Sequence, residues 1–265
     1  MLNWKLAGLA GGGVAVTSTL FSKLCMRHGL HVFSYGEYPS LIRGGHNTAQ
    51  VTAGTETVTS QKRALDILIA LNADGINLHL KELTKNSIIL VDKAQTKLDW
   101  EKTAILGTVV DLPMYSISVE VTGGGLAANM VTLGASAYLL GLDMSILNTL
   151  IEESFKKKGD KVVSGNQLAA QKGFEYVKNL KLRALSPVKI EPQDQIFVSG
   201  NEAVGLGALA GGLQFYAAYP MTPASSLLHV FAKHERDYGI VVKHTEDEIA
   251  AINMAIGASF AGVRA

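Results

Sequence analysis

A short proline-bounded loop near the end of the sequence has the composition of a ligand-holding segment. The loop reads YPMTP at 219–223 and stands before Ser225-Ser226 and an apolar helical run. Proline fixes the backbone φ angle and removes an N–H donor, so two prolines this close give a stiff turn. Serine side chains accept hydrogen bonds from the first N–H groups of a helix, so we expect the serine pair to cap the helix that follows. The pattern therefore predicts a rigid loop that leads into a capped helix.

Three acidic residues precede an apolar stretch close to the C-terminal end. Thr245 has the spacing of a capping box with Glu248, and Glu246, Asp247 and Glu248 complement the positive end of a helix. This structural role accounts for all three acids without catalysis. The helix expected over 249–261 is apolar and built from small residues, which predicts that it is buried. We then expect Glu248, at its mouth, to be partly desolvated.

A glycine-rich turn lies between an expected N-terminal strand and a helix. The turn contains Gly8, Gly11 and Gly13. Glycines let a backbone approach a phosphate closely, and a helix N-terminus favours anions. The alternative is an ordinary tight turn of an α/β sheet. Glu37, in an expected loop, does not take the place of the acidic residue that reads the ribose in dinucleotide-binding folds.

A second polar cluster follows the strand expected at 31–38. Arg43, Gly44, Gly45 and His46 combine an anion-binding guanidinium, a flexible backbone pair and an imidazole. At the carboxyl edge of a parallel sheet, where α/β folds bind ligands, these residues would contact an anion. The alternative is an exposed turn whose arginine and histidine have no ligand.

Composition limits the possible functions. The chain has 265 residues, a net charge of +1 and 18% charged residues, which argues against nucleic acid or an acidic membrane surface as a partner. Its one cysteine, Cys25, excludes an internal disulfide or a cysteine-rich metal cluster within these residues and fits a reducing compartment. No run of about 18 apolar residues occurs, so we expect a cytoplasmic protein.

Short apolar runs alternate with helical patterns along the first part of the chain, which predicts an α/β fold. Strands are expected at 31–38, 75–80, 87–92, 103–109 and 116–121. Helices are expected at 17–28, 60–71 and 127–140, with Gly29 and Gly141 near two of their ends.

A polar, proline-containing stretch separates the two halves of this pattern. Residues 184–195 lack helical periodicity and are expected to form an interdomain linker. A second α/β region follows, in which a glycine- and alanine-rich helix at 201–212 is expected to pack closely against another backbone surface. This gives domains at 1–183 and 196–265.

Two motifs of the second region occur together in one enzyme family. GNEAVGLGALAGGLQFYAAYPMTPASSLL and HTEDEIAAINMAIGASFAGVRA closely resemble the α subunit of 2-oxoacid:ferredoxin (acceptor) oxidoreductases, which include the pyruvate and 2-oxoglutarate enzymes. Residues 1–183, with GLAGGGV and YPSLIRGGHNTAQV, resemble the γ domain that many of these α subunits carry at their N-terminus. The resemblance covers nearly the whole chain, and the loop motif inclines toward the 2-oxoglutarate branch.

The resemblance implies a thiamine diphosphate site in the second domain. It implies that Glu248 contacts N1′ of the aminopyrimidine, where a carboxyl group favours the tautomer that removes the thiazolium C2 proton. It also implies that the Thr222 hydroxyl faces the 2-oxoacid, held in place by the flanking prolines. The implied substrate-binding residues are Tyr219, Pro220, Thr222, Pro223 and Ser225. In the γ-type domain, the candidates for coenzyme A or subunit contacts are Gly8, Gly11, Gly13, Arg43, Gly44, Gly45 and His46.

Parts that such an enzyme needs are missing from these residues. The sequence has no Gly-Asp-Gly motif for diphosphate and Mg²⁺, since its one Gly-Asp, Gly159-Asp160, leads into Lys161-Val162. One cysteine cannot hold an Fe–S cluster. Both are expected from a β subunit, in a dimer of heterodimers that passes electrons to ferredoxin. Relatives continue past the equivalent of Ala265 and supply a substrate arginine there, so a truncated reading frame is expected. The alternatives are a non-catalytic assembly module and a nucleotide-binding dehydrogenase.

Overall fold

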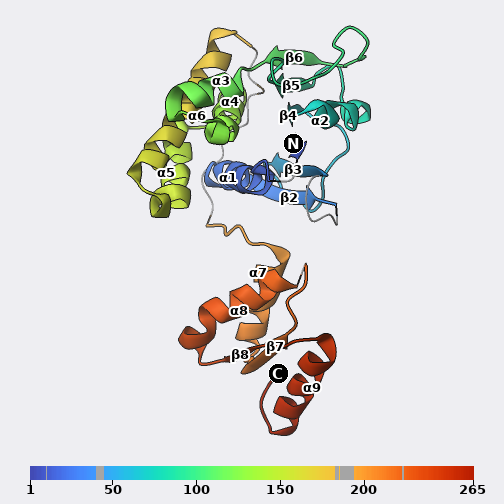
Figure 1. Ribbon diagram of the computed structural model, residues 1–265, viewed down its shortest axis with the longest axis vertical. Coiled ribbons are helices and arrows are strands. Elements are labelled where there is room, and N and C mark those ends of the chain that lie inside the picture. The colour runs from blue at the N-terminus through green and yellow to red at the C-terminus, as the bar shows by residue number, and fades with distance from the viewer. Residues whose placement is uncertain (10, 40–44, 183–184, 186–193, 223) are drawn as a thin grey trace. The chain divides into compact units, whose positions relative to one another are not determined.

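The computed structural model describes residues 1–265 except 10, 40–44, 183–184, 186–193 and 223 (Figure 1). The chain divides into two compact units, Met1–Gln195 and Ile196–Ala265, which we call the N-terminal and the C-terminal unit. Most of the expected linker, 184–195, lies outside the described residues.

The N-terminal unit is built on a six-stranded sheet in the order β2-β3-β1-β4-β5-β6. Strand β1 is parallel to β4, and β4, β5 and β6 are parallel in turn, whereas β3 is antiparallel to both of its neighbours, β1 and β2. The strands are β1 (Leu2–Leu9), β2 (His31–Glu37), β3 (His46–Gly54), β4 (Ile67–Ala70), β5 (Ile88–Val91) and β6 (Thr108–Asp111).

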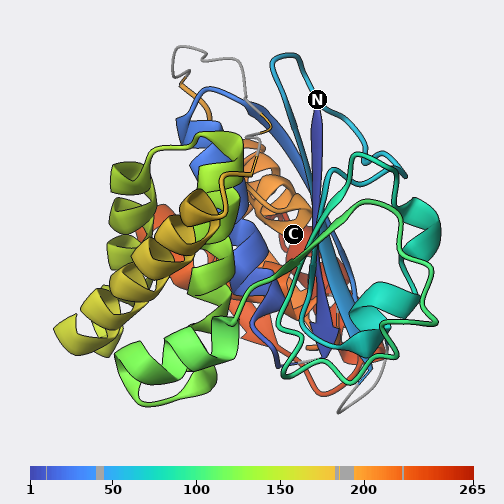
Figure 2. The same ribbon diagram turned by 90° about the horizontal axis from the view of Figure 1, so that it is seen from above.

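Helices cover both faces of this sheet, as Figures 1 and 2 show. The larger layer contains α1 (Val14–Arg27), α3 (Met114–Thr122), α4 (Ala128–Leu140), α5 (Met144–Phe155) and α6 (Asp160–Asn179), with short 3₁₀ helices at Gly125–Ala127 and Lys156–Lys158. The opposite face carries α2 (Ala73–Asn77) and a 3₁₀ helix at Leu80–Glu82. Because both faces are covered, the central strands β4 and β5 are apolar and buried along their whole length.

The main core lies between the sheet and the larger helical layer. Trp4 of β1 stacks on Phe21 of α1 with ring centroids 4.3 Å apart, and its indole N–H donates to Ser136 of α4. Helices α4 and α6 approach so closely that a Cβ on Gly134 would lie 1.8 Å from the carbonyl oxygen of Ala170. This close contact packs α4 and α6 backbone to backbone within the helical layer.

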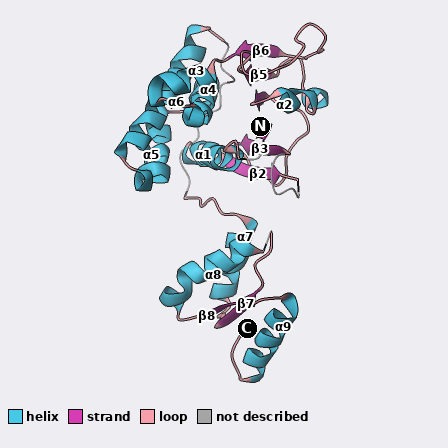
Figure 3. Ribbon diagram, in the orientation of Figure 1, coloured by secondary structure: helices cyan, strands magenta, loops and turns pink. Residues whose placement is uncertain are grey.

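The C-terminal unit is smaller and holds two parallel strands, β7 (Phe215–Ala218) and β8 (Val241–His244). Its helices are α7 (Gly200–Ala210), α8 (Ser225–Tyr238) and α9 (Glu248–Phe260). Helix α8 contacts α7 and β8, while α9 packs against β7 (Figure 3). The close approach of α7 occurs at Gly205, where a Cβ would meet side chains of α8, Val230 and Leu227, rather than the expected backbone.

The α/β class is confirmed, and so are the strands expected at 31–38 and 87–92 and the helices expected at 17–28 and 127–140. The expected strand at 103–109 is nearly all loop, because β6 begins only at Thr108. Strand β3 has no counterpart among the expected elements.

Three expected elements are wrong in type. The helix expected at 60–71 is a loop followed by β4, whose four apolar residues fill the place between β1 and β5. The strand expected at 75–80 is α2 and a turn, because Asn72 caps a helix by accepting from the N–H of Gly75. The strand expected at 116–121 lies in α3, which buries Met114, Ile117 and Ser118 at helical spacing.

Candidate functional site

The carboxyl ends of β7 and β8 bring the two C-terminal motifs to one edge. Parallel neighbouring strands end on the same side of a sheet, so the loop after β7 and the turn after β8 share that side. The N–H of Thr245, directly after β8, donates to the carbonyl of Ala218 at the end of β7 over 3.0 Å. Thr222 and Glu248 therefore belong to two adjoining segments of one sheet edge.

The loop after β7 is open to solvent in this chain. Tyr219, Met221 and Thr222 are exposed, Pro220 is half-buried, and Pro223 lies outside the described residues. The loop is tied to helix α8 by the hydroxyl and the N–H of Ser225, which both donate to the carbonyl of Met221. The side chain of Thr222 is thus presented outward from an anchored turn.

The expected serine cap of α8 is wrong. The N-cap residue is Ala224, which makes no side-chain cap, and α8 begins at Ser225 itself. Ser226 instead accepts a hydrogen bond from the amide of Asn201 on α7. Ser225 therefore anchors the loop and Ser226 contacts α7, whereas neither serine caps the first N–H groups of α8.

The capping box expected from Thr245 and Glu248 is also wrong. Asp247 is the N-cap of α9, and its carboxylate accepts from the N–H of Ala250 over 2.7 Å. Thr245 is buried and donates its hydroxyl to the carbonyl of Asp247. Glu248, the first helical residue, is exposed rather than desolvated, and its carboxyl group makes no hydrogen bond to any residue that the structure describes. Asp247 thus provides the helix cap that the sequence predicted from Thr245 and Glu248. The carboxyl group of Glu248 takes no part in capping the helix.

Replacing Asp247 by alanine should destabilise the C-terminal unit by about 1 kcal/mol, because the N–H of Ala250 loses its acceptor. Thermal unfolding followed by circular dichroism measures the change. The Asp247→Asn variant, which keeps an acceptor oxygen, should stay within a few tenths of a kcal/mol of the parent. Equal losses for both variants would contradict this assignment of the cap.

Helix α9 is exposed, although its composition predicted burial. Ile249 is 74% exposed, Ile256 59% and Phe260 95%, and no residue of α9 is buried. Within this unit, α9 packs against β7, and many of its apolar side chains remain exposed.

The glycine-rich turn of the N-terminal unit connects β1 to α1 as expected. Gly11 and Gly13 have φ angles of +84° and +75°, which only glycine adopts readily, and the amide of Asn129 on α4 donates to the carbonyl of Gly12. Gly8 lies in β1, where a Cβ would be 2.9 Å from Leu71 Cδ1. These contacts explain the glycines without a ligand. Nothing in the local sequence singles out Asn129, since only the fold brings it to the turn.

The cluster at 43–46 is only partly visible, because Arg43 and Gly44 lie outside the described residues. Gly45 has a φ angle of +87°, and His46 begins β3 opposite Leu9. The expected parallel setting is wrong, since β3 is antiparallel to β1. The start of an antiparallel strand nevertheless lies at the carboxyl end of its neighbour, so His46 does reach the expected edge.

A buried polar network that sequence reasoning missed adjoins His46. Its Nε2 lies 2.9 Å from Nε2 of His79, and Nδ1 of His79 lies 3.1 Å from a carboxylate oxygen of Glu82. Lys5 of β1 completes the network with an ion pair to Glu82 over 2.5 Å. Burial raises the pKa of Glu82, but hydrogen bonds from His79 and Lys5 outweigh it and hold that pKa below its usual value.

The strand order argues against a dinucleotide-binding fold. Strand β2 is separated from β1 by β3, and Glu37 ends β2 within the sheet rather than in the expected loop. In a dinucleotide-binding domain the acidic residue ends a strand adjacent to the glycine-rich turn. Here β3 lies between β2 and β1, so Glu37 is one strand further from the glycine-rich turn than that acidic residue would be.

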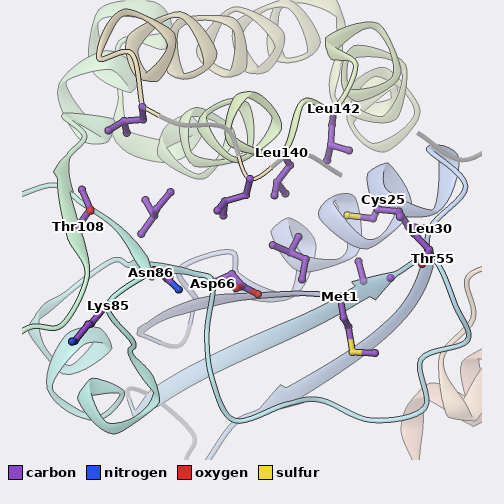
Figure 4. Close-up of a pocket in the computed structure, with 16 residues that line it drawn as sticks. Met1, Cys25, Leu30, Thr55, Asp66, Lys85, Asn86, Thr108, Leu140 and Leu142 are labelled. Atoms are coloured by element: carbon purple, nitrogen blue, oxygen red, sulfur yellow. The ribbon is translucent and has the colours of Figure 1, made fainter. Parts of the chain in front are cut away.

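A cavity of about 800 Å³ opens at the opposite end of the sheet (Figure 4). Met1, Asp66 and Thr108 lie at its strand side and Leu140 and Leu142 at its helix side, and none of the sequence-predicted site residues lines it. Cys25 borders this cavity with a fully buried side chain, and burial raises the pKa of its thiol to about 12. The thiol therefore stays protonated and unreactive at neutral pH.

The described part of the chain also lacks two other kinds of feature. It contains no group of three or more His, Cys, Asp or Glu side chains arranged to hold a metal ion. Among the same residues, none of the helices combines the length and apolar character needed to cross a bilayer.

Two family models match the chain in order. Residues 3–176 match the model described as pyruvate ferredoxin/flavodoxin oxidoreductase. Residues 206–265 match the model described as pyruvate flavodoxin/ferredoxin oxidoreductase, thiamine diphosphate-binding. The first match covers the six-stranded sheet and most of its helices, and the second covers the edge that holds Thr222 and Glu248.

Individual relatives agree with these models. The 2-oxoacid:ferredoxin oxidoreductase subunit alpha of a Sulfolobus species is 28% identical over 100% of this chain and 49% of its own length. The 2-oxoglutarate oxidoreductase subunit KorA of Mycobacterium tuberculosis is 25% identical over 97% of this chain and 45% of its own.

A solved structure shares the fold. The 2-oxoglutarate:ferredoxin oxidoreductase of Magnetococcus marinus, with 2-oxoglutarate, coenzyme A and succinyl-CoA bound, is 30% identical with a TM-score of 0.87, covering 99% of this chain and 46% of that one. The chain thus spans about half the length of the relatives it matches. With its N-terminal unit matched over residues 3–176, this chain belongs to the pyruvate ferredoxin/flavodoxin oxidoreductase family.

Proposed function

We propose that the chain works as the α-type part of a 2-oxoacid:ferredoxin oxidoreductase. The reaction is the oxidative decarboxylation of a 2-oxoacid with coenzyme A to an acyl-CoA and CO₂, with two electrons passed through an Fe–S cluster of a partner subunit to ferredoxin. The observation that carries the proposal is the shared edge of β7 and β8, which gathers the 219–222 loop and Glu248 in the region that matches a thiamine diphosphate-binding model. Relatives named for 2-oxoglutarate favour that substrate over pyruvate.

The residues present fit one half of a thiamine diphosphate site. Glu248 offers a carboxyl group that no described residue engages, at a helix start where Asp247 already serves as the cap. A carboxyl group is the donor that the aminopyrimidine N1′ needs, so Glu248 would hold the cofactor there and exchange a proton at that nitrogen. Bound thiamine diphosphate supplies the carbon nucleophile and the electron sink of the decarboxylation.

The second half of the site is assigned to a β subunit. Diphosphate and Mg²⁺ need oxygen ligands that the sequence shows no motif for, and the single cysteine is buried and cannot bind a cluster. The uncovered apolar side chains of α9, which starts at Glu248, give such a partner a surface to pack on next to the cofactor. We propose a dimer of heterodimers in which the cofactor lies between the two kinds of chain.

Thr222 is assigned to the substrate. Its hydroxyl would donate to the 2-oxoacid carboxylate or to the keto oxygen as negative charge develops there. The contacts of Ser225 with Met221 support this role, because they anchor the turn that presents Thr222. Tyr219, Pro220 and Pro223 would shape the same pocket.

Replacing Thr222 by valine should lower kcat/KM for the 2-oxoacid by roughly 10- to 100-fold, since one hydrogen bond to the substrate is lost without a change in side-chain size. Steady-state assays of the assembled complex measure this effect. Thr222→Ser keeps the hydroxyl and should recover most of the activity. A valine variant with unchanged kcat/KM would remove Thr222 from the substrate site.

In the N-terminal unit, coenzyme A or the partner subunit would contact the edge formed by the glycine-rich turn and the start of β3. The turn from β1 to α1 and His46 both lie at the carboxyl end of β1, which supports a single contact region. The residues assigned to it are Gly8, Gly11, Gly13, Arg43, Gly44, Gly45 and His46.

The function is tested by assembling the chain with a β-type subunit, thiamine diphosphate and Mg²⁺. Reduction of viologen that requires both the 2-oxoacid and coenzyme A supports the oxidoreductase. A stable complex that forms without any such reduction would point instead to the non-catalytic assembly module. Binding of NAD(P) by the chain alone would support the dehydrogenase, which the position of β2 already disfavours.

A further inference from the structure

Thr245 lies between the two motifs of the candidate site. It follows β8 directly and is buried, with 3% of its surface exposed. Its N–H donates to the carbonyl of Ala218 over 3.0 Å, and its hydroxyl donates to the carbonyl of Asp247 over 3.0 Å. A single buried residue thus contacts both the last residue of β7 and the residue before Glu248.

The contact with Asp247 holds the peptide group from which Glu248 begins. Because a peptide group is planar, the carbonyl oxygen of Asp247 lies in one plane with the nitrogen and the Cα of Glu248. That oxygen accepts from the Thr245 hydroxyl and, over 3.2 Å, from the N–H of Ala251, which engages both of its lone pairs. Since two donors hold the oxygen, the Cα of Glu248 is held with it.

The contact with Ala218 acts in the same way on the substrate loop. The carbonyl oxygen of Ala218 shares a peptide plane with the nitrogen and the Cα of Tyr219, at the entry to the loop that presents Thr222. This contact uses the backbone N–H of Thr245, whereas the contact with Asp247 uses the hydroxyl. A substitution that removes the hydroxyl therefore tests the second contact without removing the first.

The side chain of Glu248 is located by its backbone. Its carboxyl group is exposed and makes no hydrogen bond to any residue that the structure describes, so the position of its Cα decides where it can reach. A group that acts on a bound cofactor has to be held within about 0.5 Å of its working position. Because Thr245 is buried, water does not compete for its hydroxyl, and the contact is stronger than the same hydrogen bond at the surface.

We propose that Thr245 is a positioning residue for Glu248. Its hydroxyl holds the peptide group between Asp247 and Glu248, so that the carboxyl group of Glu248 meets N1′ of the aminopyrimidine. This inference rests on the proposed function, and it gives Thr245 no contact with cofactor or substrate. Because Thr245 acts only through Glu248, removing the carboxyl group of Glu248 should remove most of the effect of the hydroxyl.

A double-mutant cycle in the complex assembled with a β-type subunit tests the inference. Thr245→Val removes the hydroxyl and keeps the side-chain shape, and it should raise the Kd of thiamine diphosphate with Mg²⁺ about 3- to 10-fold in isothermal titration, the effect of one hydrogen bond. In a chain that already carries Glu248→Gln, Thr245→Val should change that Kd less than about twofold, because the two residues act as a unit. Thr245→Ser keeps the hydroxyl and should restore the parent's Kd. At saturating cofactor, kcat for the 2-oxoacid should follow the same pattern.

Glu235→Ala is the matched control. Its carboxylate accepts from the N–H of Val242 over 3.1 Å, near the start of β8, so the substitution removes a hydrogen bond from the same unit at the other end of that strand. The Kd should stay close to the parent's with either residue at 248. This separates the position of Glu248 from a general loss of stability in the C-terminal unit.

Two results would overturn the positioning role. One is an unchanged Kd in Thr245→Val, and the other is a rise of the same size with glutamate and with glutamine at 248, as a purely structural contact would give. If Thr245→Val does not fold, Thr245→Ala takes its place, because it also lacks the hydroxyl and cannot overpack the site. A parent complex that binds no thiamine diphosphate would overturn the proposed function and this inference with it, whereas normal binding by the parent and by Thr245→Val overturns the inference alone.

Discussion

Replacing Glu248 by glutamine should lower 2-oxoacid-dependent viologen reduction by the assembled complex about 10²- to 10⁴-fold, the range typical of losing one proton-transfer group. Glutamine keeps the size of the side chain, but its amide binds N1′ of the cofactor less strongly than a carboxyl group and cannot exchange a proton with it. Since Asp247 and not Glu248 caps α9, the substitution leaves the helix start intact. At saturating thiamine diphosphate the loss should therefore appear in kcat, with the complex still assembled.

Glu246→Gln is the matched control for this experiment. Glu246 is an exposed acidic residue of the same turn, just before the cap, so its neutralisation changes the local charge equally. Activity close to the parent in Glu246→Gln, together with the loss in Glu248→Gln, separates a specific carboxyl group from a general field effect. Equal activity of the two variants would contradict the assignment of Glu248.

Replacing Gly134 by alanine should destabilise the N-terminal unit by about 3 kcal/mol. The added Cβ would lie 1.8 Å from the carbonyl oxygen of Ala170, and Gly173 makes the reciprocal close approach to Val131. Backbone cannot move aside as a side-chain tip can, so α4 and α6 must separate. Urea unfolding followed by tryptophan fluorescence measures the loss, because Trp4 and Trp100, the two tryptophans of the sequence, both lie in this unit.

Gly207→Ala is the control for the glycine substitution. Gly207 lies inside α7 of the C-terminal unit, and a Cβ there would meet nothing within 4 Å. Alanine at such a helical position should add roughly 0.5–1 kcal/mol to the stability of α7 and leave the tryptophan transition unchanged. An unchanged transition in Gly134→Ala as well would show that the two helices are not locked by this contact.

The sequence predicted best what depends on neighbouring residues. The helices at 17–28 and 127–140 were predicted from apolar spacing with a glycine near each end, and Gly29 and Gly141 do adopt the left-handed conformation there. The strand at 87–92 was recognisable because a buried parallel strand is apolar throughout. These patterns depend on residues that are close together in the sequence, so they can be recognised without knowing the tertiary structure.

The wrong elements depend on tertiary context. The sequence at 116–121 is rich in β-branched residues but forms α3, since burial of Met114, Ile117 and Ser118 outweighs a weak strand propensity. Residues 67–70 form a strand rather than a helix because they pair with β1 on one side and β5 on the other. Neither neighbour is visible in the local sequence.

The sequence motifs of the candidate site could be recognised, but the spatial arrangement of their residues could not be predicted. The loop at 219–223 and Glu248 could be singled out from the sequence, whereas their common edge follows from the pairing of β7 with β8. Competition for the cap of α9 was also decided by structure, where the shorter side chain of Asp247 reaches the N–H of Ala250. His79 and Glu82 carried no signal at all, because only the fold places them beside His46.

In the proposed enzyme, this chain holds half of a thiamine diphosphate site and a β-type subunit completes it. Isothermal titration of thiamine diphosphate with Mg²⁺ into the chain, into the β-type subunit and into their mixture distinguishes a shared site from a site on one chain. We expect tight binding only in the mixture, and weaker binding when the chain carries Glu248→Gln. Binding by the β-type subunit alone that equals the mixture and ignores Glu248→Gln would contradict it.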